Sequence, residues 1–360
     1  MSANTFATNT LHHPRAFTWA EIVQQPLLWL DTLARIKTRH NEGWGSFRHV
    51  LLSGAGSSAY AAAAVSSGWA RTVAIPSTDL LVDLPPDLGA DWLVVNFSRS
   101  GDSPESAAVI SRIQTISPEV RHLAITCNSA GLLATLPGVE VIVLHPRTND
   151  RSVTMTSSFS NLVLAGLCLT NADPISSALE GICARTEAAF EYMDAKALKI
   201  SKWVRGRVAI LASQPLLAAA REASLKILEL SAGQVMAMPE TYVGLRHGPL
   251  TFVQEDTPVL CFVSAEEHRR RYEMDLIAEL RSKGLGRLIG IMPSTANEEL
   301  FDEVIAAAAP DLPDRLRSPF EMVFPQMLAY HVSQSVGLDP DNPSPNGVIN
   351  RVVQGVRIHD

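Results

Sequence analysis

Three serines and an arginine stand close together in a segment that could bind an anion. The segment 98–103 (SRSGDS) follows the apolar run 92–97, and the Pro-Glu pair behind it is typical of the first turn of a helix. Free backbone N–H groups at a helix start attract anions, and a glycine lets an anion approach the backbone closely. The hydroxyls of Ser98, Ser100 and Ser103 add short donors that suit a terminal phosphate. The alternative interpretation is that Ser100 or Ser103 only caps the helix.

A second hydroxyl-rich loop, 54–59 (GAGSSA), follows another apolar run at 49–53. Two such loops at the ends of neighbouring strands favour phosphate binding over capping alone. The second loop also fits G-x-G-x-x-A, the dinucleotide fingerprint, and Asp79 lies roughly 20 residues further on, as a ribose-binding acid should. A single match of this kind is weak, and Asp79 follows Pro76, beyond its predicted strand. A dinucleotide-dependent oxidoreductase therefore stays open as an alternative.

Charged residues at helical spacing form a third candidate. Glu222, Lys226 and Glu229 stand at i, i+4 and i+7 within 221–230, so they share one face of a helix with leucines around them. Partial burial raises the pKa of a carboxyl group and makes it a competent base, while a nearby ammonium keeps it ionised. The alternative is an ordinary surface ion pair between Glu222 and Lys226.

A histidine follows in the segment 243–250 (VGLRHGPL). His247 stands between an arginine and a Gly-Pro turn, which indicates a fixed and accessible loop position. Because histidine changes charge near neutral pH and the charged helix lies just upstream, His247 is a candidate proton carrier.

These residues need a scaffold, and short apolar runs alternate with amphipathic stretches along the chain. The predicted strands cover residues 49–53, 92–97, 123–126, 139–144, 207–212, 258–263 and 287–292. Strand, loop and helix in this order are typical of a parallel sheet covered by helices. The order repeats, because Trp92 to Arg121 and Pro258 to Arg287 are both 29 residues apart. We expect an α/β protein with two doubly wound, mainly parallel-sheet subdomains of the flavodoxin-like, three-layer αβα type.

The expected organisation has five parts. A helical N-terminal extension (1–45) precedes a first subdomain with the phosphate loops (46–175). A helical connector (176–202) leads to a second subdomain with the glutamate and the histidine (203–345). The C-terminal tail (346–360) is expected to lie over the active site. Ligands bind at the carboxyl ends of parallel strands, so the Gly- and Ser-rich loops predict that the first subdomain holds the anion.

Composition and charge exclude other classes of protein. Apolar residues make up 46% and charged residues 19%, which is globular rather than disordered. Lys and Arg total 30 against 37 Asp and Glu, and a net charge of −7 gives no global field for nucleic acid or an anionic membrane. The four cysteines show no metal-ligand spacing, and the apolar stretch 162–169 falls far short of the roughly 18 residues of a membrane span. We expect a reduced, soluble, cytoplasmic protein.

Several motifs together resemble the sugar isomerase (SIS) family. GAGSSA, SRSGDS, KILEL and LRHGPL occur in the order typical of that family. Within it, the chain resembles the bacterial D-galactosamine-6-phosphate deaminase/isomerases, also called tagatose-6-phosphate ketose/aldose isomerases. The supporting matches run nearly end to end: TWAEI, QQP, SRSGDSPES, ITCN, MTSS, AREASLKILEL, GLRHGP and NRVVQGVRIH.

The resemblance implies a role for each matching residue. Glu229 matches the carboxylate that moves the proton between C1 and C2, and His247 matches the histidine that assists ring opening. Lys226 and Glu222 match charged neighbours that orient this machinery. The residues implied in binding the substrate or its phosphate are Gly56, Ser57, Ser58, Ser98, Arg99, Ser100, Ser103, Thr156, Ser157, Asn350, Arg351 and Gln354.

One departure from the related glucosamine-6-phosphate synthases points to the reaction. Those enzymes carry a tail lysine that forms a Schiff base with the ketose, and Gln354 stands in the corresponding place here. The sequence also has no N-terminal nucleophilic cysteine and no glutaminase domain, which favours ammonia release over synthesis. The predicted reaction converts D-galactosamine 6-phosphate and water to D-tagatose 6-phosphate and ammonia, with no metal or organic cofactor.

The partner expected from the resemblance is a second copy of the chain. In related isomerases the ring-opening histidine comes from the adjacent subunit, so we expect a homodimer whose sites combine Glu229 of one chain with His247 of the other. Besides the small-molecule substrate, no nucleic acid or membrane partner is expected. A plain aldose/ketose isomerase and a non-catalytic sugar-phosphate sensor stay open as alternatives.

Overall fold

Two five-stranded parallel sheets dominate the computed structural model, which describes residues 16–39, 43–344 and 346–359. The first sheet has the order β2-β1-β3-β4-β5, and the second has the order β10-β9-β8-β6-β7. Numbered within its own half, each sheet has the strand order 2-1-3-4-5. The bounds are β1 His49–Ser53, β2 Thr72–Ala74, β3 Trp92–Ser98, β4 Arg121–Thr126, β5 Val139–Val143, β6 Arg207–Ala212, β7 Met236–Glu240, β8 Pro258–Phe262, β9 Arg287–Met292 and β10 Glu303–Ala306.

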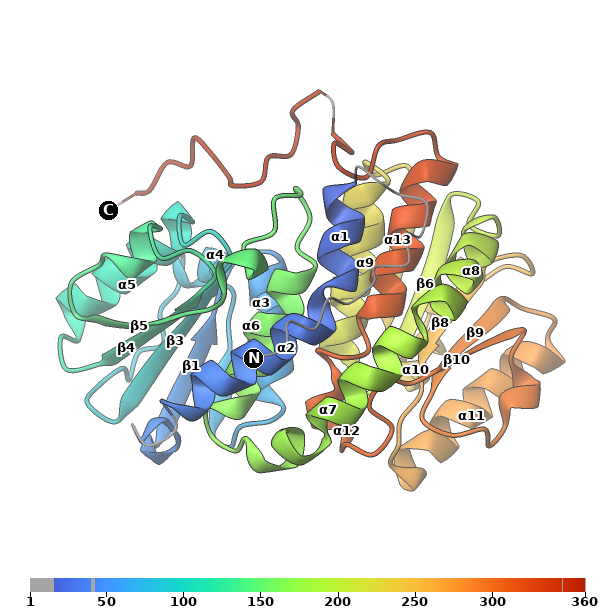
Figure 1. Ribbon diagram of the computed structural model, residues 1–360, viewed down its shortest axis with the longest axis horizontal. Helices are drawn as coiled ribbons and strands as arrows, with labels where there is room; N and C mark the ends of the chain where they lie inside the picture. The colour runs from blue at the N-terminus through green and yellow to red at the C-terminus, as the bar shows by residue number, and fades with distance from the viewer. Residues whose placement is uncertain (1–15, 40–42, 345, 360) are drawn as a thin grey trace, which may run out of the picture.

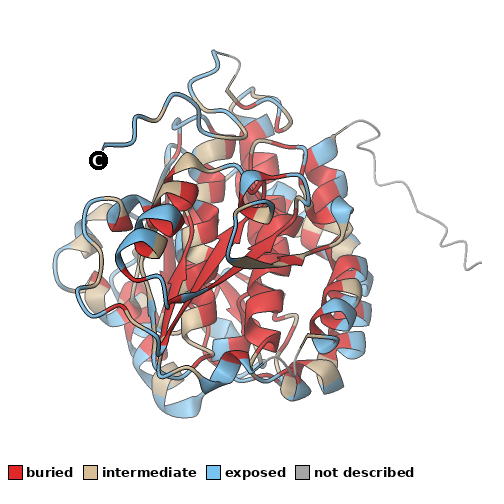
Figure 2. Ribbon diagram, turned by 90° about the vertical axis from the view of Figure 1, so that its left-hand side faces the viewer, coloured by how far each residue is buried: buried red, intermediate tan, exposed pale blue. Residues whose placement is uncertain are grey.

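The central strands are apolar because helices cover both of their faces. Every residue of β3 and of β8 is buried, as expected for a parallel sheet inside an α/β layer structure. Figure 2 shows the buried strands and the exposed outer surfaces of the helices around them. The predicted doubly wound α/β fold is confirmed.

Helices lie on both faces of the first sheet. On its inner face, α3 (Ser57–Ser66) and α6 (Ser157–Cys168) pack against Leu93, Val95 and Phe97 of β3. On its outer face, α4 (Ser77–Leu80) and α5 (Pro104–Ile116) cover the alternate residues of the same strand, such as Val94. The alternation follows from the two-residue period of a strand.

The second sheet is covered in the same manner. Its inner face packs on α8 (Phe190–Ser201), α9 (Leu217–Leu230) and α13 (Val323–Ser335). Its outer face packs on α10 (Tyr242–Leu245) and α11 (Glu267–Ser282). The remaining helices are α1 (Phe17–Val23), α2 (Gln25–Lys37), α7 (Asp173–Ala188), α12 (Asp314–Arg317) and the short 3₁₀ turns η2 (Trp44–Ser46), η3 (Leu132–Ala134), η4 (Pro146–Thr148), η5 (Pro249–Phe252) and η6 (Glu298–Leu300).

The inner helices of both halves share one hydrophobic core. A single cluster of buried side chains runs from α1 and α2 through the inner faces of both sheets to α13. Figure 1 shows these helices standing between the two sheets. Within this layer α9 contacts α3, so the second half brings a helix against the helix that follows the hydroxyl-rich loop 54–59. This contact positions the candidate site.

The structure adds elements that the sequence pattern did not predict. The strands β2, β7 and β10 lie at sheet edges, and helices α6 and α13 complete the inner layer. The helical connector is two helices and begins at Asp173 rather than at residue 176. The four cysteines are free and buried. No helix in the described ranges has both the length and the apolar character needed to cross a bilayer.

Candidate active site

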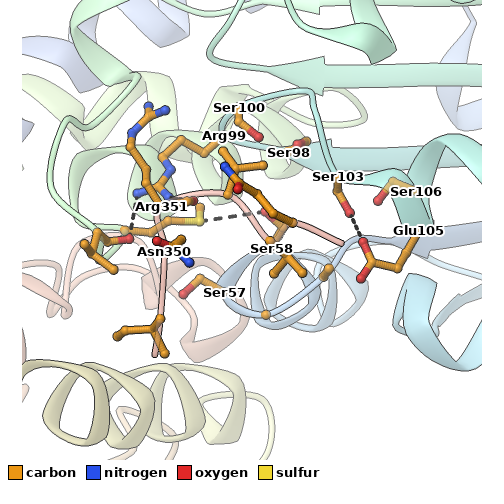
Figure 3. A pocket seen from close by; sticks show the side chains of 18 of the residues that line it. Ser57, Ser58, Ser98, Arg99, Ser100, Ser103, Glu105, Ser106, Asn350 and Arg351 are labelled. Atoms are coloured by element: carbon orange, nitrogen blue, oxygen red, sulfur yellow. Dashed lines mark hydrogen bonds between the residues drawn. The ribbon is translucent and has the colours of Figure 1, made fainter. Parts of the chain in front are cut away.

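A cavity of about 370 Å³ opens at the carboxyl ends of β1 and β3, where the strand order of the first sheet reverses. This switch point is where open α/β sheets bind ligands, and the volume is in the range of small-molecule sites. Its walls come from the loops after both strands, the segment before α6, helix α9 and the C-terminal tail (Figure 3). The lining residues are Ala55, Gly56, Ser57, Ser58, Phe97, Ser98, Arg99, Ser100, Ser103, Glu105, Ser106, Val153, Met155, Glu229, Val348, Ile349, Asn350, Arg351, Val352, Val353 and Gln354.

Two helices begin at this cavity, and in the described residues the first-turn N–H groups of Ser57, Glu105 and Ser106 have no hydrogen-bond partner. Helix α3 starts at Ser57 after Gly56, whose φ of 57° is easily adopted only by glycine. Helix α5 starts at Pro104 after Ser103, and neither N-cap residue forms a side-chain capping hydrogen bond. Ser103 Oγ instead donates to Glu105 Oε2 at 2.8 Å, so the capping interpretation does not hold for Ser103.

The serine hydroxyls shape the loop as well as facing the cavity. Ser98 Oγ accepts a hydrogen bond from Gly101 N at 2.9 Å, and Ser100 Oγ accepts from Asp102 N at 3.1 Å. Because each hydroxyl accepts from the backbone, its own proton is directed elsewhere and is suited to a ligand oxygen. The loop is thus folded on itself with donors toward the cavity.

The charged face of α9 is buried, which excludes the surface-pair interpretation. The side chains of Glu222 and Lys226 are both 0% exposed, and that of Glu229 is 24% exposed at the cavity wall. Lys226 Nζ lies 2.6 Å from Glu229 Oε2, 3.2 Å from Glu222 Oε1 and 3.0 Å from Ser57 Oγ. One ammonium therefore joins both carboxylates to the hydroxyl-rich loop 54–59.

Burial and charge act in opposite directions on this group of residues. Burial raises the pKa of Glu222 to about 7, although the charge of Lys226 opposes the rise. For Lys226, burial alone lowers the pKa, but the charges of Glu222 and Glu229 outweigh burial and raise the pKa above its ordinary value. Lys226 is consequently a permanent cation next to Glu229.

Glu229 has two donors on one oxygen. Its Oε2 accepts from Lys226 Nζ and also from Thr154 Oγ1, at 2.8 Å. Within the described residues no group hydrogen-bonds its Oε1. A carboxylate held by one oxygen with the other available is suited to take and return a proton.

The segment before α6 is anchored by two buried carboxylates. Asp150 accepts from the backbone N–H groups of Thr156 and Ser158, both at 2.8 Å, and from the hydroxyls of Ser157 and Ser158. Glu21 of α1 accepts from Arg151 N and Ser152 Oγ, and burial with the charge of Asp150 raises its pKa to about 7. These bonds hold the residues in between at the cavity wall.

Thr156 and Ser157, which were expected to bind substrate, lie outside the cavity. Both are completely buried, and the Ser157 hydroxyl is used by Asp150. Their neighbours Val153 and Met155 line the cavity instead. The MTSS segment (155–158) therefore lies at the site, but Met155 rather than Thr156 or Ser157 lines the cavity.

Arg99 is almost completely buried and contacts main-chain carbonyls. Its guanidinium donates to the carbonyl oxygens of Ser152 and Val153, both at 3.0 Å, and to that of Arg351 at 2.6 Å. Burial and the charge of Arg351 lower the pKa of Arg99. Arg351 in turn donates to the carbonyl of Asp150 at 2.7 Å, so the two arginines fasten the tail beside the cavity.

Asn350, Arg351 and Gln354 of the tail all line the cavity, whereas His247 does not. His247 is exposed in the turn after α10. One chain therefore brings Glu229, the serine loops and the tail together but not the histidine. Asp79, the acid of the dinucleotide alternative, is exposed in α4 and also lies outside the cavity lining.

Sequence reasoning missed several residues of the site. Thr154 and Glu21 contribute through contacts between segments far apart in the chain, and Glu105 and Ser106 line the cavity. The MTSS motif gave a signal for the right segment, but no spacing rule indicated a bond between Thr154 and Glu229. In the described residues no group of His, Cys, Asp and Glu side chains is arranged to hold a metal ion.

Comparisons with known proteins place this architecture in a family. A Streptomyces coelicolor protein provisionally named D-galactosamine-6-phosphate deaminase AgaS is 36% identical over 94% of this chain and 94% of its own length. D-galactosamine-6-phosphate deaminase AgaS of Escherichia coli O157:H7 is 33% identical over 95% of this chain and 96% of its own.

A solved structure agrees with these relatives. The crystal structure of a Clostridium novyi protein, provisionally described as a tagatose-6-phosphate ketose/aldose isomerase, superposes with a TM-score of 0.89 at 30% identity and covers 96% of this chain and 95% of that one. No family model matches the chain. The expected family is confirmed: the chain belongs to the D-galactosamine-6-phosphate deaminase AgaS family of SIS-fold proteins.

Proposed function

We propose that this protein is an enzyme that releases ammonia from D-galactosamine 6-phosphate and forms D-tagatose 6-phosphate. The observation that carries the proposal is the bridge made by Lys226, whose ammonium contacts Ser57 of a hydroxyl-rich loop and Glu229 at the wall of the same cavity. A phosphate site and a carboxylate base are thereby held at a fixed separation. The names of the relatives supply the substrate.

The phosphate is expected at the N-termini of α3 and α5. The N–H groups that have no partner among the described residues, those of Ser57, Glu105 and Ser106, lie there. The hydroxyls of Ser58, Ser98 and Ser100 line the same part of the cavity. Arg99 and Arg351 form no ion pair with a carboxylate in the described part of the chain. Their positive charge in a partly enclosed cavity favours an anionic ligand, because a buried cation needs a countercharge.

The proton transfers then follow from the position of Glu229. After the sugar ring opens, Oε1 of Glu229 takes the C2 proton, which is acidic beside the C1 aldehyde, while the aldehyde oxygen gains a proton. The resulting enolamine accepts a proton at C1 and becomes a ketimine at C2. Water adds to the ketimine, and the C2–N bond breaks to give the ketose and ammonia. The ammonium of Lys226, 2.6 Å from Glu229 Oε2, holds the carboxylate in place during the transfer.

The proposed ring-opening residue, His247, requires a second copy of the chain. It is exposed and does not line the cavity of its own chain. Large apolar side chains near Glu229 and His247 in the sequence are exposed: Leu228 (45%), Met236 (63%) and Val243 (46%). Exposed apolar side chains on α9, β7 and α10 support an interface between two copies, and a two-fold contact would exchange His247 between them.

Mixing two inactive variants tests the shared site. Glu229→Gln and His247→Ala subunits, each inactive alone, should recover about a quarter of wild-type activity after random exchange, because half of the dimers would be mixed and each would hold one intact site. Proven subunit exchange without recovered activity would contradict a shared site.

Plain aldose/ketose isomerisation is the second candidate, since the similar Clostridium novyi structure carries that description. A coupled ammonia assay across galactosamine 6-phosphate, glucosamine 6-phosphate and the corresponding plain aldose phosphates separates the two. We expect ammonia from galactosamine 6-phosphate. Turnover of an aldose phosphate without ammonia from any amino sugar would leave only the isomerase. A cytoplasmic location stays a prediction.

A further inference from the structure

Thr154 makes a contact with Glu229 that no sequence motif explains. The two residues are 75 positions apart, and the Thr154 hydroxyl donates to Glu229 Oε2 at 2.8 Å. Thr154 is 1% exposed and is absent from the cavity lining, so its hydroxyl faces the carboxylate from behind the ligand space. It is therefore placed to act on Glu229 rather than on the substrate.

The geometry of the two donors fixes the carboxylate. A glutamate carboxyl group rotates freely about its last torsion, which has broad, roughly two-fold preferences. Lys226 alone, whose ammonium acts as a point charge, would leave this rotation loosely defined. Because Thr154 donates to the same oxygen as Lys226, from a separate segment of the chain, Oε2 is held on the protein side and Oε1 is left toward the cavity.

The segment that carries Thr154 is itself rigidly held. On one side of Thr154, Glu21 accepts from Ser152 Oγ at 2.6 Å, and Arg99 donates to the carbonyl of Val153 at 3.0 Å. On the other side, Asp150 accepts from Thr156 N at 2.8 Å. Because the Thr154 hydroxyl lies between these anchors, it cannot move with the Glu229 carboxylate if the carboxylate rotates. The hydrogen bond therefore opposes that rotation.

We propose that Thr154 is a positioning residue that holds Glu229 with Oε1 directed at the C2 proton of the substrate. The inference rests on the proposed function, in which Glu229 is the base. A carboxylate displaced or rotated from the reacting proton lowers the rate of transfer without weakening phosphate binding. Thr154 should therefore affect kcat and leave KM nearly unchanged.

The test compares two substitutions at the same position. Thr154→Val keeps the shape and removes the donor, whereas Thr154→Ser keeps the donor. A hydrogen bond to a charged group is worth roughly tenfold or more in an equilibrium. We expect kcat for ammonia release to fall about tenfold in T154V, with KM within about twofold of wild type, and kcat of T154S to stay within about twofold.

Thr186→Val is the matched control, because Thr186 is a buried threonine of α7 whose hydroxyl bonds Ile182 O away from the site. It should leave kcat unchanged. If urea denaturation shows that T154V is unfolded, T154A, which also lacks the donor and needs no added space, carries the same expectation.

The outcomes separate this inference from the proposed function. Wild-type protein that releases no ammonia from any amino-sugar phosphate would contradict the function itself. Active wild type with an unchanged kcat in T154V, an equal loss in T154S, or a change in KM alone would overturn the positioning role.

Discussion

Replacing Glu222 by glutamine should change how stability depends on pH. Glu222 is completely buried, and its folded-state pKa is about 7 against an ordinary 4.5, chiefly because burial disfavours the charged form. Glutamine has nearly the same shape but does not titrate. The comparison between the two proteins therefore isolates the proton on this one residue.

The sign follows from where the proton is bound more tightly. Between pH 4.5 and about 7 the folded protein keeps the Glu222 proton while the unfolded chain loses it, so stability falls as pH rises. One pKa unit corresponds to about 1.4 kcal/mol, so the loss approaches about 3 kcal/mol. The glutamine variant lacks this loss, and its free energy of unfolding relative to wild type should rise by about 2 to 3 kcal/mol from pH 5 to pH 8.

Equilibrium urea unfolding at pH 5, 6, 7 and 8 measures this difference. Glu21 and Glu273 also have pKa values raised to about 7 by burial, but both residues are present in wild type and variant, so their contributions cancel. Glu255→Gln, at an exposed position, is the control and should show a constant offset. If the free energy of unfolding had the same pH profile in Glu222→Gln and in wild type, Glu222 would not be a buried carboxyl group with a raised pKa.

Two further predictions concern the phosphate loop. Ser98→Ala should raise KM roughly tenfold and lower kcat little in initial-rate measurements, because phosphate is held similarly in ground and transition states. An unchanged KM would show that the phosphate binds elsewhere. Arg99→Lys should lower kcat/KM and expose the tail to limited proteolysis, since an ammonium cannot reproduce the guanidinium bonds to Ser152, Val153 and Arg351. A tail as resistant as in wild type would show that Arg99 does not fasten it.

The central strands were predictable because both of their faces are buried. Continuous apolar runs such as those of β3 and β8 mark buried strands without further information. The edge strands carry weaker signals: β2 is three residues long and nowhere fully buried, and β7 contains Pro239, which argues against a central strand. These strands form because they pair with the open edge of a neighbouring strand, and a local stretch of sequence does not show that this edge is available.

The site divides in the same way between local and long-range features. The serine loops could be found because a strand end, a glycine and a helix start are local features. The i, i+4 spacing placed Glu222 and Lys226 on one face but could not tell whether that face is buried. The packing of α9 against α3 decides it.

Long-range contacts account for what the sequence pattern could not indicate. Thr156 and Ser157 were assigned to substrate, but their partner is Asp150, and the turn of the chain before α6 directs Val153 and Met155 to the cavity. Thr154 and Glu21 could not be found because their roles depend on residues more than 70 positions away.

Loss of the C2 proton from galactosamine 6-phosphate, followed by NMR in D₂O with ammonia measured in the same sample, tests the central claim most directly. Wild-type protein should remove this proton and release ammonia. Glu229→Gln should bind the substrate yet slow both processes by roughly a hundredfold or more, the usual range for loss of a general base. Proton loss and ammonia release near the wild-type rate in Glu229→Gln would contradict the account, because another group would then take the proton.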